Sequence, residues 1–132
     1  MEIEVTPYRI EEDYTDKRHP DKIRWAKTIE EDLKRRDFTV NAMALKIQKS
    51  PKKENYRIID LFDGQKDLRN QIIRAVLDPK RRFSEDALRM MRAVRFSVTL
   101  NPHRLWKIEE KTAQAIKKFA HLLEFISRER IR

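Results

Sequence analysis

The first stretch of alternating apolar and polar residues predicts a strand at the start of the chain. We expect it over residues 2–10. Pro7 removes one backbone donor, which places this strand at the edge of a sheet. Residues 11–21 are strongly polar and predict a loop.

A capping box predicts the first helix. Thr28 is followed three residues later by Glu31, so each side chain can bond a free backbone N–H at the helix start. We expect the helix over residues 29–36.

Two further apolar stretches predict strands over residues 43–47 and 58–59, joined by a polar turn over residues 48–55. Asp63 and Gly64 predict a tight turn, and residues 65–70 predict a short helical segment.

From residue 83 onward the apolar period becomes helical. The first stripe consists of Ala87, Met91, Val94 and Val98. Asn101 and Pro102 predict the start of a second helix, whose apolar face is Leu105, Ile108, Thr112, Ala115 and Phe119. Residues 122–126 are short and apolar, and Ser127 resembles the cap of another helix. The whole pattern predicts an α+β chain, with a small α/β part followed by an all-helical part.

Charge indicates the kind of partner. The 132 residues include 31 Lys and Arg against 22 Asp and Glu, a formal net charge of +9. Such a basic chain favours a polyanionic partner, of which nucleic acid is the commonest, while a solvated basic surface is the plainer alternative.

Composition also excludes several classes of protein. The chain has no cysteine, which excludes disulfides and thiolate metal sites. No apolar run is long enough for a membrane span, and the first residues do not form a signal peptide, so we expect a cytoplasmic protein. Gly64 is the single glycine, which excludes a glycine-rich phosphate loop.

Residues 82–92 form the more informative of two charged clusters. On a helix, Asp86 and Arg89 lie on one face, flanked by Glu85 and Arg92. Asp accepts hydrogen bonds and Arg donates them. Together they match the Watson–Crick edges of adenine and cytosine, whereas guanine and uracil set a carbonyl against the carboxylate. The pair would select ATP and CTP; a salt-bridged helix face is the alternative.

The other cluster, Arg-Arg-Asp-Phe-Thr-Val-Asn-Ala at residues 35–42, follows the first predicted helix. With Glu-Asp-Ala-Leu-Arg-Met-Met-Arg at 85–92, it closely resembles motifs of the tRNA nucleotidyltransferase/poly(A) polymerase family, and the bacterial-type class is the most similar. Residues 14–20, 60–68 and 126–131 resemble its flexible loop, its head–neck hinge and its next motif.

The resemblance implies a fold and an activity. Residues 1–77 would be the C-terminal part of a nucleotidyltransferase head, and residues 78–132 a truncated helical neck that recognises the base. These enzymes add C and A nucleotides from CTP and ATP to the 3′ end of tRNA, or add poly(A) tails. The partners implied are nucleoside triphosphates and an RNA 3′ end.

The resemblance also implies roles for residues. Asp86 and Arg89 would read the base. The sugar and phosphates would be contacted by Arg35, Arg36, Asp37, Asn41 and Arg92. Supporting or hinge roles would fall to Glu85, Asp60, Gly64 and Arg130. For Arg35 and Arg36, cations placed against a helix C-terminus are the alternative, and a plain turn is the alternative around Gly64.

The metal-binding part of the family pattern is not found. Nucleotidyl transfer of this kind uses two metal ions, implied here as Mg²⁺, held after a Gly-rich turn by an Asp-x-Asp pair. The chain contains no Asp-x-Asp. Glu4 is the one candidate for an accessory carboxylate, with a terminal strand position as the alternative. We therefore expect a fragment, which is a split gene product, a truncated reading frame or a piece that needs a complementary chain.

The histidines and tryptophans give little further indication of function. His19, His103 and His121 share no spacing and do not predict a metal site. Trp25 and Trp106 could stack on bases, although helix packing is the simpler interpretation of Trp106. Three hypotheses stay open: part of a nucleotidyltransferase, a non-catalytic basic module that binds RNA or nucleotide, and a non-functional remnant.

Overall fold

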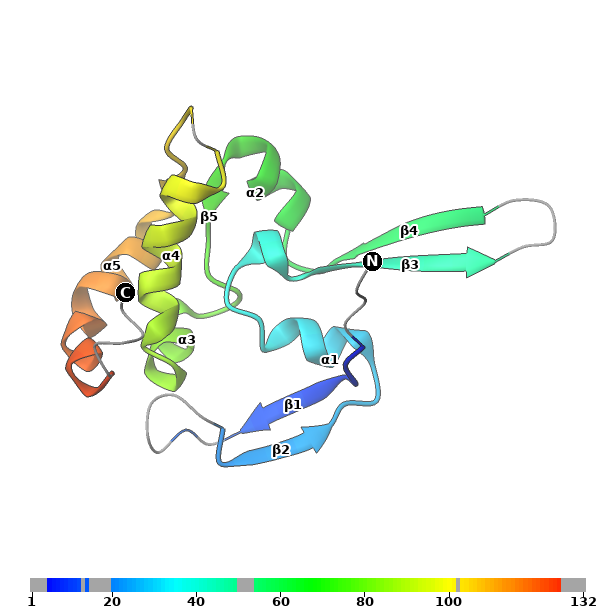
Figure 1. Ribbon diagram of the computed structural model, residues 1–132, viewed down its shortest axis with the longest axis horizontal. Coiled ribbons are helices and arrows are strands. Elements are labelled where there is room, and N and C mark those ends of the chain that lie inside the picture. The colour runs from blue at the N-terminus through cyan, green and yellow to red at the C-terminus, as the bar shows by residue number, and fades with distance from the viewer. Residues whose placement is uncertain (1–4, 13, 15–19, 50–53, 102, 127–132) are drawn as a thin grey trace.

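A computed structural model describes residues 5–12, 14, 20–49, 54–101 and 103–126. Two β-hairpins and the helix α1 lie on one side of the molecule, and α3, α4 and α5 lie on the other (Figure 1). Within the described residues, each sheet has two strands. An α+β architecture is confirmed. None of the described helices is long and apolar enough to cross a membrane.

The first hairpin pairs β1 (Arg9–Glu12) antiparallel with β2 (Lys22–Trp25). The predicted strand over residues 2–10 was wrong in its bounds: residues 5–8 have no regular structure, and residues 1–4 lie outside the described residues. The strand instead includes Glu11, which was predicted to lie in a loop. Glu11 can occupy a half-covered strand because its carboxylate pairs with Arg9 and with Arg35.

Helix α1 (Ile29–Lys34) begins with the predicted capping box. Thr28 accepts from the Glu31 amide, and the Glu31 side chain accepts from the amides of Thr28 and Lys27. The helix ends two residues earlier than predicted. A short 3₁₀ turn, η1 (Thr39–Asn41), follows.

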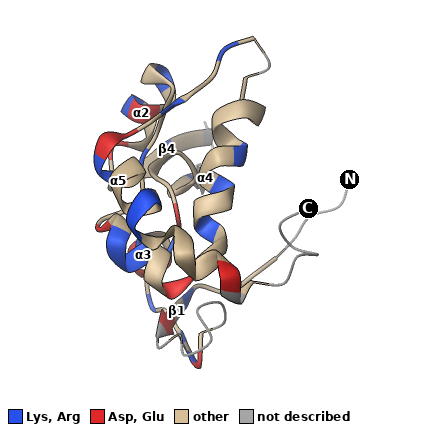
Figure 2. Cartoon of the chain, turned by 90° about the vertical axis from the view of Figure 1, so that its left-hand side faces the viewer, with Lys and Arg blue, Asp and Glu red and all other residues tan. Residues whose placement is uncertain are grey.

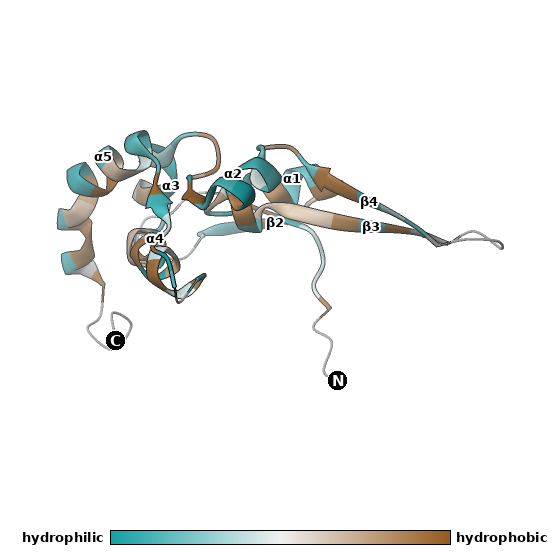
Figure 3. Cartoon of the chain, turned by 90° about the horizontal axis from the view of Figure 1, so that it is seen from above, coloured by the Kyte–Doolittle hydropathy of each residue, from teal (hydrophilic) through white to brown (hydrophobic). Residues whose placement is uncertain are grey.

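The second hairpin confirms two predicted strands and extends both. β3 (Met43–Lys49) pairs antiparallel with β4 (Glu54–Asp60). The centre of the predicted turn lies outside the described residues, and its two ends belong to the strands. Register places Leu45 opposite Ile58 and Ile47 opposite Tyr56. All four side chains are exposed, so the hairpin has one uncovered apolar face; Figure 3 shows it projecting from the rest of the molecule.

Helix α2 (Gly64–Asn70) confirms the predicted helical segment. At the predicted tight turn, the positive φ belongs to Asp63 (58°) and not to Gly64. Gly64 is required for close approach instead: a Cβ there would lie 2.3 Å from the Thr39 carbonyl oxygen and 2.9 Å from the Met43 side chain.

The second half contains β5 (Ile72–Ile73), α3 (Pro79–Glu85), α4 (Leu88–Thr99), β6 (Lys107–Ile108), α5 (Glu110–Phe119) and η2 (Ala120–Phe125). β5 and β6 pair in parallel. The helix expected from residue 83 onward is not continuous, because Asp86 is extended (φ −141°) and separates α3 from α4. The helix predicted from Asn101 begins only at Glu110, and Leu105 is 72% exposed. Ser127 lies outside the described residues.

The core joins both halves of the chain. Its fully buried members include Phe38 from the first half and Phe83, Met90 and Ala93 from the second. The predicted stripe on α4 was therefore partly wrong, since Val94 and Val98 are about half exposed. The break at Asp86 starts a new helix at Leu88, which rotates Met90 and Ala93 toward the core.

Candidate functional site

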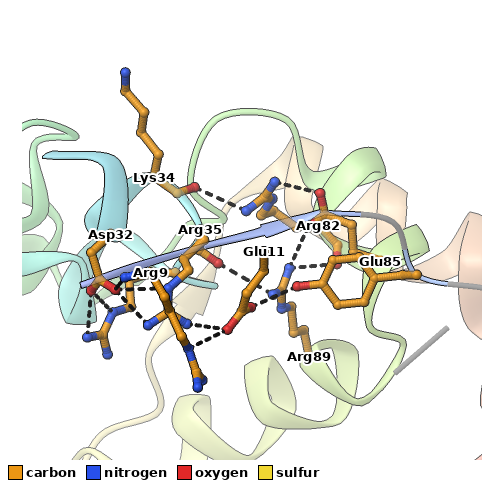
Figure 4. A network of polar contacts seen from close by, with 10 residues as sticks. Arg9, Glu11, Asp32, Lys34, Arg35, Arg82, Glu85 and Arg89 are labelled. Atoms are coloured by element: carbon orange, nitrogen blue, oxygen red, sulfur yellow. Dashed lines mark hydrogen bonds and ion pairs between the residues drawn. The ribbon is translucent and has the colours of Figure 1, made fainter. Parts of the chain in front are cut away.

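The two charged clusters predicted from the sequence meet in space. Arg82 donates from Nη1 to the Lys34 carbonyl (3.0 Å), and Arg89 donates from Nη2 to the Arg35 carbonyl (3.4 Å). These bonds join α3 and α4 to the end of α1 (Figure 4). Buried guanidinium groups thus cap the otherwise unpaired carbonyls at the C-terminus of α1.

Glu85 is the centre of the α3–α4 side of this cluster. Its Oε1 accepts from Arg82 Nη2 (2.8 Å) and Arg81 Nε (3.0 Å), and its Oε2 accepts from Arg89 Nη1 (2.9 Å). Arg82 and Arg89 are buried, whereas the side chain of Arg81 is 70% exposed. Glu85 therefore balances two buried charges and holds Arg89 in one orientation.

Asp86 and Arg89 lie at the start of α4, but not as the sequence predicted. Asp86 precedes the helix and its Oδ1 accepts from the Leu88 amide (2.9 Å), so it acts as a helix cap. Arg89 pairs with Glu85 and with the Arg82 carbonyl. The predicted placement of the pair on one continuous helix face was wrong; Asp86 and Arg89 nevertheless lie near enough to influence each other's charge.

Asp37 connects the first cluster to α4. Its Oδ1 accepts from Asn41 Nδ2 (2.7 Å) and from the Phe38 amide (3.0 Å). Its Oδ2 forms an ion pair with Arg92 Nε (2.5 Å). The Arg92 guanidinium also lies over the Phe96 ring, 5.1 Å from its centroid. The structure therefore brings Asp37, Asn41 and Arg92 together, three residues that the sequence assigned to sugar and phosphate.

Arg35 and Arg36 directly follow α1 and pair with carboxylates of the first half of the chain. Arg35 pairs with Asp32 Oδ1 (2.7 Å) and Glu11 Oε1 (2.7 Å), and its side chain is 18% exposed. Arg36 pairs with Asp32 Oδ2 (3.0 Å) and is 44% exposed. Arg36 is thus the more accessible of the two to a ligand.

Sequence reasoning assigned no role to several members of the cluster. Glu11, Asp32 and Arg82 hold the predicted residues in place, and the Tyr14 hydroxyl donates to Glu11 Oε2 (2.8 Å). The low exposure of Asp32 and Arg82 marks them as structural partners. Arg82 lies in the predicted cluster at residues 82–92, whereas Asp32 lies outside both predicted clusters. Asp32 does lie one helical turn before Arg36, a spacing that predicts an ion pair.

Burial and hydrogen bonding shift the pKa values of Asp86, Asp32 and Tyr14 in the cluster. Burial raises the pKa of Asp86 above its usual value, and the Leu88 amide only partly offsets that effect. Burial would also raise the pKa of Asp32, but bonds from Arg35, the Arg9 amide and Arg36 lower it overall. Burial and the bond to Glu11 raise the pKa of the Tyr14 hydroxyl.

Asp60 and Gly64 form a separate structure. Asp60 accepts hydrogen bonds from the amides of Gly64 (2.8 Å), Gln65 (2.9 Å) and Phe62 (3.4 Å), and so caps the start of α2. Glu4, His19 and Arg130 lie outside the described residues. Trp106 is 8% exposed in the core, which agrees with the packing interpretation.

The carboxylates of the cluster do not fit a metal site. Glu85, Asp37 and Asp32 each accept from arginine at 3.0 Å or less. Among the residues that the structure describes, no group of three or more His, Cys, Asp or Glu side chains is placed to hold a metal ion. No chemical step at this cluster is assigned to a metal.

Comparison with known proteins identifies the family. Residues 1–74, more than half of the chain, match the family model of the poly A polymerase head domain. Residues 106–132 match the model described as the probable RNA and SrmB-binding site of polymerase A. The chain therefore belongs to the tRNA nucleotidyltransferase/poly(A) polymerase family.

Individual relatives of the chain support the same family. The chain is 54% identical over 128 residues to the CCA-adding enzyme of Ligilactobacillus salivarius, covering 97% of this chain and 29% of that protein. The crystal structure of the Bacillus stearothermophilus CCA-adding enzyme in complex with CTP matches with a TM-score of 0.72 and 40% identity, over 96% of this chain and 27% of that one. The Thermotoga maritima CCA-adding enzyme complexed with tRNA matches with a TM-score of 0.63 and 37% identity, over 79% and 24%. The chain spans about 30% of the length of the curated relatives it matches.

Proposed function

We propose that this chain is the nucleotide-selecting head and neck part of a tRNA nucleotidyltransferase that adds C and A from CTP and ATP to RNA 3′ ends. Residues 1–77 form the head part and residues 78–132 the neck. The observation that carries the proposal is that Asp86, Arg89 and Arg92 lie within two helical turns at the start of α4, with Asp37 ion-paired to Arg92, in a chain similar to CCA-adding enzymes.

Base selection follows from the donors and acceptors of two side chains. Asp86 Oδ1 is held by the Leu88 amide, and we assign Oδ2 to the amino group of adenine or cytosine. Arg89 Nη1 is bonded to Glu85 and the Arg82 carbonyl. Its Nη2 makes only a long contact of 3.4 Å to the Arg35 carbonyl, so this nitrogen can donate to a ring nitrogen at low cost. Glu85 is the positioning residue for Arg89.

The remaining residues are assigned to the sugar and phosphates. Arg36, the more exposed arginine after α1, contacts the triphosphate with Arg35 behind it. Asp37, Asn41 and Arg92 form one bonded unit that faces the ribose and phosphates. Asp60 and Gly64 hold the start of α2 within the head part, in the segment assigned a supporting or hinge role.

We further propose that transfer itself uses Mg²⁺ held by carboxylates outside the described residues, on a complementary segment. The support is that the chain spans about 30% of its relatives' length. When bound, Mg²⁺ would activate the RNA 3′ hydroxyl and neutralise the triphosphate. An RNA 3′ end, as of tRNA, is the proposed acceptor.

Nucleotide binding by the 132-residue chain and its variants tests the proposal. Titration with ATP, CTP, GTP and UTP should show a preference for ATP and CTP of about ten- to a hundredfold, the discrimination expected of a two-bond base contact. Asp86→Ala and Arg89→Ala should each remove that preference, while Arg36→Ala should weaken all four nucleotides alike. Circular dichroism of each variant controls for folding.

Two outcomes would contradict the proposal. If both variants keep the preference for ATP and CTP, the base-reading assignment is wrong. If the wild-type chain binds all four nucleotides equally, this part of the protein does not select nucleotides. Incorporation of labelled CTP and ATP into a tRNA without its 3′ end, after adding the complementary segment and Mg²⁺, tests the transfer step.

A further inference from the structure

A polar cavity lies beside the C-terminal end of α1. It has a volume of about 340 Å³, within the range of roughly 300–1,000 Å³ that is typical of small-ligand sites. It lies between the residues before β1, the paired ends of β1 and β2, and the end of α1. The residues that line it are Thr6, Pro7, Arg9, Trp25, Arg35 and Arg36.

The charges around this cavity are arranged for an anion. Glu11 and Asp32 are buried, with side chains 8% and 4% exposed. Glu11 binds Arg9 Nε (2.8 Å), and Asp32 binds Arg36 Nη2 (3.0 Å). The side chains of Arg9 and Arg36 are 46% and 44% exposed. The cavity is thus lined by three arginines that share two buried carboxylates. Its net charge is positive, and the exposed guanidinium groups can donate hydrogen bonds to an anion.

Trp25 adds an aromatic surface to that charge. Its side chain is 72% exposed, whereas Trp106 is 8% exposed. Trp25 pairs with Arg9 across the β1–β2 hairpin, so the two side chains lie on the same face. An exposed indole beside accessible arginines is the combination with which proteins bind single-stranded nucleic acid, because any base can stack on the ring.

The cavity adjoins the proposed nucleotide site. Arg35 lines the cavity with its side chain, while its carbonyl accepts from Arg89 Nη2. In nucleotidyl transfer the 3′ hydroxyl of the RNA attacks the α-phosphate of the incoming nucleotide. The last RNA nucleotide must therefore lie beside that nucleotide, and the cavity shares Arg35 and Arg36 with the proposed nucleotide site.

We propose that the cavity binds the 3′-terminal nucleotide of single-stranded RNA, with its base stacked on Trp25 and its phosphate held by Arg9. The assignment to the acceptor strand rests on the function proposed above; the binding of single-stranded RNA rests on the cavity itself. Arg36, on the border, remains with the triphosphate.

Tryptophan fluorescence of the 132-residue chain tests this proposal directly. The trinucleotide ApCpC should quench the emission saturably, and Trp25→Phe should lose that quenching. Trp25→Ala should weaken binding of a fluorescently labelled ApCpC about tenfold, the effect expected from losing one stacked base, with CTP affinity unchanged. Arg9→Gln should weaken the trinucleotide and lower its log–log salt slope by about 0.7.

Matched variants control for general effects. Tyr56→Ala removes an exposed aromatic side chain from the other hairpin, and Arg81→Gln removes an exposed arginine from α3. Both should bind ApCpC like the wild type. If either weakens the trinucleotide as much as its counterpart does, binding is not local to the cavity and the proposal is overturned.

Two further outcomes would also overturn it. One is that ApCpC fails to quench Trp25. The other is that CTP quenches as strongly and loses as much affinity in Trp25→Ala, which would make the cavity part of the triphosphate site. Asp86→Ala separates this proposal from the proposed nucleotide selection. If ApCpC still quenches Trp25 in Asp86→Ala, which should have no nucleotide preference, RNA binding by the cavity is supported independently of nucleotide selection. The same holds if the wild type itself shows no nucleotide preference but is quenched by ApCpC.

Discussion

At the scale of single residues, Glu85 is the side chain on which three guanidinium groups converge. Two of them, Arg82 and Arg89, are buried and also donate to backbone carbonyls of the first half of the chain. One carboxylate thus supports both the junction of the two halves and the orientation of a proposed base-reading residue.

We predict that Glu85→Gln destabilises the protein by about 3 kcal/mol, because two buried guanidinium charges lose their counter-charge. Arg81→Gln removes the exposed partner of the same carboxylate and should cost less than about 1 kcal/mol. Urea denaturation followed by circular dichroism measures both. Equal stability of the two variants would show that burial does not determine the strength of these pairs.

At the scale of elements, the contact between α2 and η1 depends on Gly64. The helix begins so close to the Thr39 carbonyl that no side chain fits between them. This contact and the Asp60 cap place α2 against the segment that carries Asp37 and Asn41.

Gly64→Ala therefore separates two physical effects of opposite sign. Helix propensity alone favours alanine by about 1 kcal/mol. The clash with a backbone oxygen should outweigh this gain and destabilise the protein by roughly 1–3 kcal/mol. Thermal denaturation of Gly64→Ala beside Lys66→Ala, an exposed position on the same helix, measures the difference; a more stable Gly64→Ala would mean that the close approach is absent in solution.

At the scale of the whole molecule, charge pairs join the two halves and make stability depend on pH. Burial would raise the pKa values of Asp32, Asp60 and Glu109, but hydrogen bonds outweigh it and lower all three. Arg74 links Asp67 on α2 to Glu109 before α5. A carboxylate with a lowered pKa stabilises the fold above its unfolded pKa, and this contribution is lost as the pH falls through the folded value.

We therefore predict that the melting temperature falls as the pH decreases below about 4.5, the unfolded pKa of a glutamate. Glu109→Gln should melt at a lower temperature than the wild type at pH 7 and show a smaller further decrease on acidification. Glu110→Gln, an exposed neighbour, should keep the wild-type pH dependence. Differential scanning calorimetry across this range provides the measurement, and a variant Glu109→Gln with the full wild-type decrease would contradict the assignment.

Local signals were sufficient for several elements. The capping box at Thr28 predicted α1, and alternating residues predicted β3 and β4, because these patterns are satisfied by neighbours in the sequence or across one hairpin. The family motifs around Arg35 and Asp86 likewise identified both sides of the junction. They were recognisable because residue types and spacing alone define them.

Tertiary structure decided what local patterns could not. The apolar period predicted one helix through Asp86, but the helix is interrupted there. A new helix begins after Asp86 because its side chain caps the Leu88 amide and because this start buries Met90 and Ala93. Glu11 entered a strand because its charge is paired by Arg35, 24 residues away. The sequence by itself determined the residue types, the local elements and the family; long-range charge pairing and burial, which no window of sequence contains, determined where the helices break and which arginines a ligand can reach.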